Sequence, residues 1–435
     1  MATLLASAAL LNGCLSAPAS SDVPTRVPTA NALATVGPEA DAAGSSVPST
    51  WTPTASETPL TPTPDVATLR LAAAQAQAEA AASMVADGSQ SAATAPATTP
   101  QRQIIPTNTP TPTPSNTPTP TATPITGPDI RPLDQYALTD VIPLEAFPRP
   151  PGDNGWGMHW IPTVSQEPAV VDRFVNELVR MHIKWVVFLN DGTNIGTNDY
   201  LVDRLVGAGI MPVMRVFRSN LLPYDGDLGK MVAHYRQRGV YYYQLYNEPN
   251  ANVENDQGFS NPTRYALTWA SAAREVIANG GLPGLGALSP GGAYNHYAFL
   301  ERTLLALQRH GDGDLLNHTW LAVHNYHGLR PLDDPNGFLL FRRYDEIVRT
   351  QLGRSLPMIG TEGGSYSPNP QVEADLLAWQ YGYMREAEPY FFAFSHWLLA
   401  NLEGGSADST WEWQTLFRDG FVHPLVTEFF YHNRR

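Results

Sequence analysis

The chain has 435 residues, a formal net charge of −14 at pH 7 and one cysteine. A single cysteine excludes an intrachain disulfide, so the folded part must be held together by its core. The acidic balance comes with only two lysines, Lys184 and Lys230, and leaves no basic stripe for a nucleic-acid backbone to follow. A nucleic-acid partner is therefore not expected.

Residues 1–14 are predicted to be a lipoprotein-type signal segment. The apolar stretch Leu4–Leu11 is followed by Asn12-Gly13-Cys14, and this order resembles a bacterial lipobox, in which the cysteine is lipidated and becomes the new N-terminus. We expect lipidated Cys14 to anchor the protein in a membrane at the bacterial cell surface or on its extracellular side. The alternative is an incidental cysteine. No later stretch of the sequence is long and apolar enough to span a bilayer.

Residues 15–128 are predicted to form a linker. Ala, Pro, Ser and Thr dominate this stretch, which contains a Thr-Pro repeat from Thr107 to Pro124. So few large apolar side chains cannot bury enough surface to offset the entropy of ordering the chain. Regularly spaced prolines favour an extended polyproline-like form, as in a stiff spacer or stalk.

Residues 129–435 are predicted to form one α/β domain. Short apolar runs alternate there with amphipathic helical patterns, which is typical of repeated βα units. Eight such units with right-handed crossovers would close into a (β/α)8 TIM barrel. An open doubly wound sheet is the alternative, but no glycine-rich phosphate loop follows the first strand. The predicted strands are Trp156–Ile161, Trp185–Leu189, Met211–Phe217, Tyr241–Tyr246, Leu285–Leu288, Trp320–Asn325, Pro357–Thr361 and Phe391–Trp397.

Two of these strands end in a glutamate that is followed at once by Pro or Gly. Glu248 ends the run Tyr243–Pro249, and Glu362 ends the run Leu356–Gly364. Such carboxylates point out of the carboxyl edge of the sheet, where (β/α)8 barrels build their active sites. Two carboxylates that face one cavity can hydrolyse a glycosidic bond, since one protonates the leaving oxygen while the other attacks the sugar or activates water.

On this strand count Glu248 ends the fourth strand and Glu362 the seventh. From about Pro150 to His432 the chain resembles the large clan of retaining (β/α)8 glycoside hydrolases, which carry an Asn-Glu-Pro motif on strand four and a nucleophilic glutamate on strand seven. The resemblance implies that Glu248 is the general acid/base and Glu362 the nucleophile. It also implies that the amide of Asn247 binds the sugar 2-hydroxyl. In the retaining geometry the two carboxyl groups lie about 5–5.5 Å apart.

Strands six and eight complete the resemblance, and Arg215 is a candidate for a different reason. His324-Asn325-Tyr326 ends strand six, where the clan uses a His-x-Tyr to hold the nucleophile, with the Tyr hydroxyl bonded to its carboxylate. Trp397 closes strand eight, where the clan places an indole under the sugar. Arg215 lies inside an apolar run, so its guanidinium should pair with a carboxylate. That partner could be Glu362, which would place Arg215 in the site, or a structural carboxylate elsewhere.

Other residues have competing interpretations. His324 and His327 could be metal ligands, but no third ligand stands at suitable spacing, so no metal is expected. Trp156, His159, Trp160, Trp411 and Trp413 could extend a substrate cleft, although aromatic residues of this kind more often belong to the core or a lid. His396 alternates with Trp397 along the strand and is expected to be structural.

These features together predict a retaining β-glycosidase. It would hydrolyse O-glycosidic bonds of a polysaccharide or oligosaccharide by double displacement through two glutamates, as a monomer and without a cofactor. One alternative is a catalytically inactive barrel that only binds glycans. Another is a surface-structural protein in which the stalk matters more than the barrel. The sugar identity and the choice between exo and endo cleavage are left open by the sequence.

Overall fold

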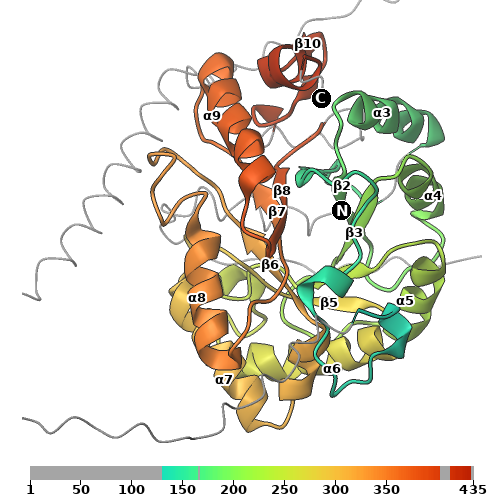
Figure 1. Cartoon of the computed structure of the whole chain (residues 1–435), viewed down its shortest axis with the longest axis vertical. Coiled ribbons are helices and arrows are strands. Elements are labelled where there is room, and N and C mark those ends of the chain that lie inside the picture. Colours follow the sequence, from blue (N-terminus) through green and yellow to red (C-terminus); the bar gives the residue numbers. More distant parts are fainter. Residues whose placement is uncertain (1–129, 165–166, 402–411, 433–435) are drawn as a thin grey trace, which may run out of the picture. The chain divides into compact units, whose positions relative to one another are not determined.

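The computed structural model describes residues 130–164, 167–401 and 412–432. The predicted signal segment with Cys14, the predicted linker and Trp411 lie outside these residues. Within them, eight parallel strands form a closed barrel in which β1 pairs with β8, and this confirms the predicted (β/α)8 fold (Figure 1). The strands are β1 (Trp156–His159), β2 (Trp185–Asn190), β3 (Met211–Val216), β4 (Tyr242–Leu245), β5 (Leu282–Leu288), β6 (Trp320–His324), β7 (Met358–Gly363) and β8 (Phe391–His396).

A helix follows each strand and forms the outer layer of the barrel. The helices are α3 (Pro168–Arg180), α4 (Asp199–Gly207), α5 (Leu228–Gln237), α6 (Pro262–Ala278), α7 (His296–Arg309), α8 (Leu340–Leu352) and α9 (Pro370–Tyr383). After β8 this place is taken by a short π-helix, Leu425–Phe430, preceded by a small hairpin of β9 (Phe417–Arg418) and β10 (Phe421–Val422). None of the described helices is both long and apolar enough to cross a lipid bilayer.

Local sequence signals explain where several helices begin. The Asn261 side chain accepts hydrogen bonds from the backbone N–H groups of Thr263 and Arg264, and Pro262 occupies the first turn of α6, as the sequence predicts. Asn369 and Pro370 start α9 in the same way. These caps satisfy backbone donors that the helix leaves without an intrahelical partner.

Two layers of apolar side chains stabilise the barrel. The larger layer lies between the strands and the surrounding helices, and the smaller one fills the interior of the barrel. Trp185, Tyr242 and Trp320 pack against one another in the interior, with ring centroids 5.6 and 5.7 Å apart. Phe147, which precedes β1, packs on this interior cluster, and the Tyr242 hydroxyl donates to the carbonyl of Pro148. The segment before β1 thus closes the amino end of the barrel and leaves its carboxyl end for a site.

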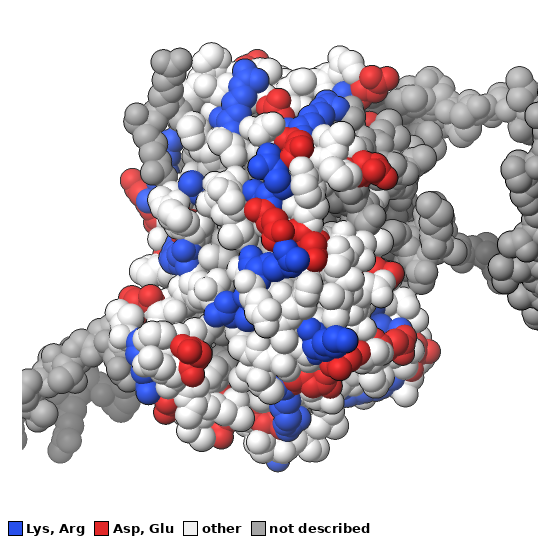
Figure 2. All heavy atoms as spheres, turned by 90° about the vertical axis from the view of Figure 1, so that its right-hand side faces the viewer, with Lys and Arg blue, Asp and Glu red and all other residues white. Residues whose placement is uncertain are grey.

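The strand predictions differ from the structure mainly at β5. This strand begins at Leu282 rather than at the predicted Leu285, because Pro283 and Gly284 have low β-propensity and hide its start. On the surface, Lys and Arg side chains alternate with Asp and Glu over the face shown in Figure 2.

Candidate active site

The two glutamates lie at the carboxyl end of the barrel, as the strand count predicts. Glu362 belongs to β7, and Glu248 follows the end of β4. The backbone at Tyr246 and Glu248 has positive φ angles of 63° and 39°, which are uncommon for residues with a side chain. The N–H of Glu248 donates to the carbonyl of Ala287 in β5 at 2.9 Å, so the neighbouring strand supports this turn. Strained backbone of this kind is often found at functional sites.

Glu362 is held by partners from two other strands. Arg215 Nη1 in β3 donates to Glu362 Oε1 at 2.6 Å, and the Tyr326 hydroxyl, just after β6, donates to Oε2 at 3.0 Å. The side chains of Arg215 and Glu362 are only 6% and 12% exposed. The structure therefore resolves the two alternatives for Arg215, because its partner is Glu362.

His324 lies between the two carboxylates. Its Nδ1 is 2.9 Å from Glu248 Oε1, and its Nε2 is 3.6 Å from Glu362 Oε1. A register shift between β6 and β7 places His324 directly opposite Glu362. The imidazole is completely buried, whereas the two glutamate side chains on either side of it are each 12% exposed.

The buried charges shift the pKa values of Glu362 and His324 in opposite directions. Burial would raise the pKa of Glu362, but His324, Arg215 and the Tyr326 hydroxyl together lower it below its ordinary value. Burial would lower the pKa of His324, but Glu362 and Glu248 raise it above its ordinary value. Glu362 is thus kept ionised, and His324 retains its proton to a higher pH than a free histidine.

Asn247 lies beside this group. Its Nδ2 donates to Glu254 Oε1 at 3.4 Å, and both residues line a cavity of about 60 Å³ together with Arg215 and Tyr246. Glu254 belongs to a short 3₁₀ helix, Asn252–Glu254, and is 8% exposed. The sequence prediction missed Glu254, because its position in a polar loop carries no signal that separates it from a solvated glutamate.

Trp397 also reaches the site. It forms a small buried cluster with Tyr326 and Leu398, against which Tyr366 packs. The rings of His159 and Trp397 are 4.2 Å apart, and burial lowers the pKa of His159 to about 4, so this histidine is neutral. Tyr366 was not predicted. Burial, together with the charges of Glu248 and Glu362, raises the pKa of its hydroxyl.

The other aromatic and histidine candidates from the sequence lie in the core or make structural contacts. Trp156 and Trp160 are core residues that pack against Tyr381 and Phe174 respectively, so they do not extend a cleft. His396 Nε2 lies 2.9 Å from the carbonyl of Gln414, in the structural role that was expected. Among the described residues no group of three or more His, Cys, Asp or Glu side chains is arranged to hold a metal ion.

No protein-family model matches the chain, and no curated protein matches it either. Similar solved structures include a family 39 glycoside hydrolase from Bacteroides cellulosilyticus WH2, at 16% identity and a TM-score of 0.46; the match covers 66% of this chain and 63% of that one. An endo-β-1,3-glucanase from Pseudomonas viridiflava is 16% identical with a TM-score of 0.45, over 65% of this chain and 98% of that one. An endo-β-1,4-glucanase from Xanthomonas axonopodis pv. citri is 12% identical with a TM-score of 0.42, over 62% and 96%. The fold assignment rests on the strand pairing of the chain itself.

Proposed function

We propose that this protein is a retaining glycoside hydrolase that cleaves O-glycosidic bonds of an oligosaccharide or polysaccharide. The observation that carries the proposal is the convergence of Glu248 and Glu362 on one buried imidazole at the carboxyl end of the barrel. The two carboxylates have different surroundings. Glu362 is paired with a guanidinium and a phenol, whereas Glu248 contacts His324. Two carboxyl groups in unlike environments can take the two roles of this reaction.

In the first step Glu362 is the nucleophile. Its carboxylate attacks the anomeric carbon and forms a covalent ester while the bond from that carbon to the leaving oxygen breaks. Glu248 donates a proton to the leaving oxygen. In the second step water attacks the anomeric carbon, Glu248 takes the water proton, and the ester bond to Glu362 breaks, which restores both side chains.

The neighbouring residues would assist these two steps. His324 Nδ1 lies beside Glu248 and would orient its carboxyl group for both proton transfers. Arg215 and Tyr326 keep Glu362 ionised before the attack. Asn247 would bind the sugar 2-hydroxyl, and the indole of Trp397 would stack on the apolar face of the sugar. The reaction needs no cofactor.

The test begins with a panel of aryl β-glycosides and polysaccharides offered to the full-length protein, because the segment before β1 is part of the barrel core. On the sugar that is cleaved, the product should keep its anomeric configuration, as measured by NMR, and a 2-fluoro glycoside should label Glu362. Glu248→Ala should still react with a dinitrophenyl leaving group, which needs no proton, and azide should restore its slow second step. Inverted product or label on Glu248 would refute the assignment. If the protein binds glycans but turns over no substrate in the panel, a catalytically inactive barrel that only binds glycans is favoured instead.

We further propose that the protein works at the bacterial cell surface, anchored through lipidated Cys14 and held away from the membrane by the proline-rich linker. A single acyl chain binds a membrane only marginally, so stable anchoring through Cys14 needs a second acyl chain or another membrane-binding element. Cys14→Ser in the native host should release the protein from the membrane fraction. Unchanged fractionation, together with no lipid adduct in the mass of the wild-type protein, would contradict the anchor.

A further inference from the structure

A row of aromatic side chains leads from the glutamates to the protein surface. We call it the aromatic track and define it as Trp397, Tyr326, Tyr366 and Trp413. Its inner members, Trp397 and Tyr326, are 5% and 8% exposed. Tyr366 is partly buried, and Trp413 is 38% exposed. Exposure thus rises along the track from the catalytic pair outward.

Each member of the outer track touches the one before it. Tyr326, whose hydroxyl donates to Glu362, lies 5.7 Å from the ring of Tyr366 at an interplanar angle of 30°. Tyr366 lies 6.2 Å from the ring of Trp413 at an angle of 67°. The charges of Glu248 and Glu362 also act on Tyr366, where they add to the effect of burial in raising the pKa of its hydroxyl. The track is therefore continuous with the catalytic pair.

The backbone beneath Trp413 is attached to the end of β8. The carbonyl of Gln414, the next residue, lies 2.9 Å from His396 Nε2 and accepts from the N–H of Leu398 at 3.4 Å. The N–H of Leu416 donates in turn to the carbonyl of Leu398 at 3.2 Å. The segment at the end of β8 that carries Trp397 thus also supports the backbone next to Trp413.

We propose that Tyr366 and Trp413 form a second sugar-binding position, adjacent to the one at Trp397 where the bond is cleaved. This inference rests on the proposed function and specifies its substrate as a glycan with at least two linked sugar units. A sugar ring has an apolar C–H face that stacks on an aromatic ring, while its hydroxyl groups can remain in water at the rim. A partly exposed indole next to a partly buried tyrosine suits this mixed surface.

Exposure alone does not make a tryptophan a binding residue. Trp379 in α9 is also 38% exposed, but its ring contacts are with Phe338 and Tyr383, whereas those of Trp413 lead to the glutamates through Tyr366. Trp379 is therefore the matched control for the loss of one indole.

The experiment compares two substrates of the sugar identified in the panel, an aryl monoglycoside and an oligosaccharide. In Trp413→Ala the ratio of kcat/KM for the oligosaccharide to kcat/KM for the monoglycoside should fall about tenfold, because only the longer substrate reaches the outer indole. Trp413→Tyr should restore much of the ratio, and Trp379→Ala should leave it unchanged. An unchanged ratio in Trp413→Ala, or an equal fall in Trp379→Ala, would overturn the proposal.

A binding measurement separates this proposal from the catalytic one. Oligosaccharide affinity is measured by calorimetry in Glu362→Gln, with and without Trp413→Ala. If the wild type turns over nothing but Trp413→Ala still weakens binding about tenfold, the proposed chemistry fails while the sugar position stands. If turnover follows the glutamates but binding does not depend on Trp413, the sugar position fails and the chemistry stands.

Discussion

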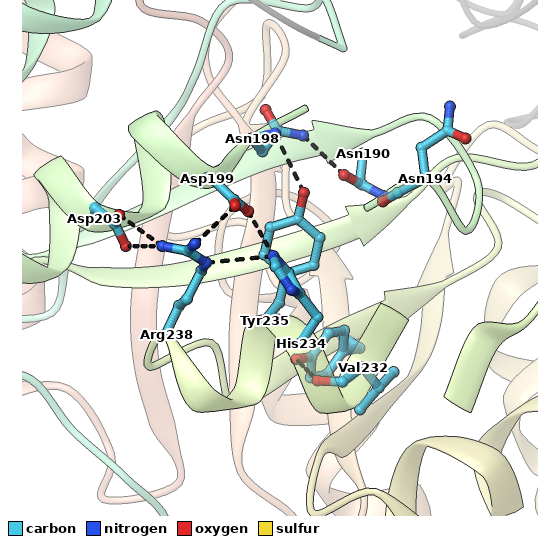
Figure 3. Close-up of polar contacts among 10 residues, drawn as sticks. Asn190, Asn194, Asn198, Asp199, Asp203, Val232, His234, Tyr235 and Arg238 are labelled. Carbon is cyan, nitrogen blue, oxygen red and sulfur yellow. Dashed lines mark hydrogen bonds and ion pairs between the residues drawn. The ribbon is translucent and has the colours of Figure 1, made fainter. Parts of the chain in front are cut away.

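Two regions of this barrel are built from the same set of charged groups, one histidine, one arginine and two carboxylates, but in different surroundings. The first is the candidate active site, with His324, Arg215, Glu248 and Glu362 at the carboxyl ends of the strands. The second, which we call the surface cluster, joins α4 to α5 and consists of Asp199, Asp203, His234 and Arg238 (Figure 3).

In the surface cluster the contacts are short but open to water. His234 Nε2 lies 2.7 Å from Asp199 Oδ1, and Arg238 reaches Asp199 at 2.8 Å and Asp203 at 2.6 Å. The four side chains are between 25% and 54% exposed. Water and salt screen such pairs, so they orient two helices and contribute little to the free energy of folding.

In the candidate active site the same kinds of groups are 0% to 12% exposed. Removing charges from water is costly unless each one is paired, and here Arg215 pairs with Glu362 and His324 with Glu248. The effect of these partners outweighs that of burial, so the pKa of Glu362 is lowered and that of His324 is raised. The comparison indicates that close pairing of charges, where little water remains to screen them, shifts the pKa values of Glu362 and His324 against the direction that burial alone would give. Shifted pKa values of this kind are common at functional sites.

The largest expected difference between the two regions is in turnover. Glu362→Gln should reduce kcat by several orders of magnitude on every glycoside, because an amide cannot form the covalent intermediate. Asp203→Asn removes one carboxylate from the surface cluster and should leave kcat unchanged. Steady-state kinetics on the same substrate measures both. Activity that survives in Glu362→Gln would move the chemistry to another group.

The next difference is in stability. Arg215→Ala leaves the buried carboxylate of Glu362 without its cation and should lower the free energy of unfolding by about 3–5 kcal/mol. Adding Glu362→Gln to Arg215→Ala should restore part of this loss, because the unpaired charge is removed. Arg238→Ala should change urea denaturation only slightly, since its partners are solvated. Equal losses of unfolding free energy in Arg215→Ala and Arg238→Ala would contradict the larger contribution expected from the buried pair.

A smaller effect is expected from one hydroxyl group. Tyr326→Phe removes the hydrogen bond to Glu362 and should lower kcat/KM about ten- to a hundredfold, as expected for a hydrogen bond to a charged group. The acidic limb of the pH–rate profile should also move to higher pH, because this hydroxyl helps to keep the pKa of Glu362 low.

Tyr235→Phe is the control for this change. Tyr235 is also a buried tyrosine, and its hydroxyl accepts from the backbone N–H of Asn198 beside the surface cluster (Figure 3). Its loss should leave kcat/KM and the pH–rate profile unchanged. A shifted profile in Tyr235→Phe, or none in Tyr326→Phe, would contradict the assignment.

The smallest effect is the pH dependence of stability. Because the pKa of Glu362 is below its ordinary value of 4.5, its contribution is present above pH 4.5 and is lost as the pH falls through the folded value. Because the pKa of His324 is above 6.5, its contribution is complete below pH 6.5 and is lost as the pH rises through the folded value. Both contributions are therefore complete only between these two pH values.

Thermal melting of the wild type and of His324→Asn tests this window. The difference in Tm between them should be largest between pH 4.5 and 6.5 and should narrow at higher pH. His234→Asn, the equivalent change in the surface cluster, should shift Tm by less at each pH, because its contact with Asp199 is open to water. A difference that widens above pH 6.5 would contradict the raised pKa of His324.

Local patterns in the sequence were sufficient for much of the fold. All eight strands are near their predicted positions, because each is an apolar run between turn residues, and α6 begins at the predicted Asn261-Pro262. Counting strands then placed Glu248 and Glu362 at one end of the barrel, since parallel strands share their carboxyl edge.

Some site residues had no such signal. Glu254 and Tyr366 lie in loops whose sequences do not distinguish a buried polar residue from a solvated one. Trp156 and Trp160 were candidates for a cleft but proved to be core residues, because an aromatic side chain near a strand end can face either direction.

The sequence by itself determined the (β/α)8 architecture and placed Glu248, Glu362 and Tyr326 at one end of the barrel. Strand period and strand order are local properties, and closure of the barrel brings the ends of distant strands close together. Only the tertiary structure decided that Arg215 pairs with Glu362 and that His324 lies between both carboxylates. Those contacts depend on a register shift between β6 and β7 and on the loss of water around the charges. Both arise only when distant segments pack together, and no local run of residues encodes them.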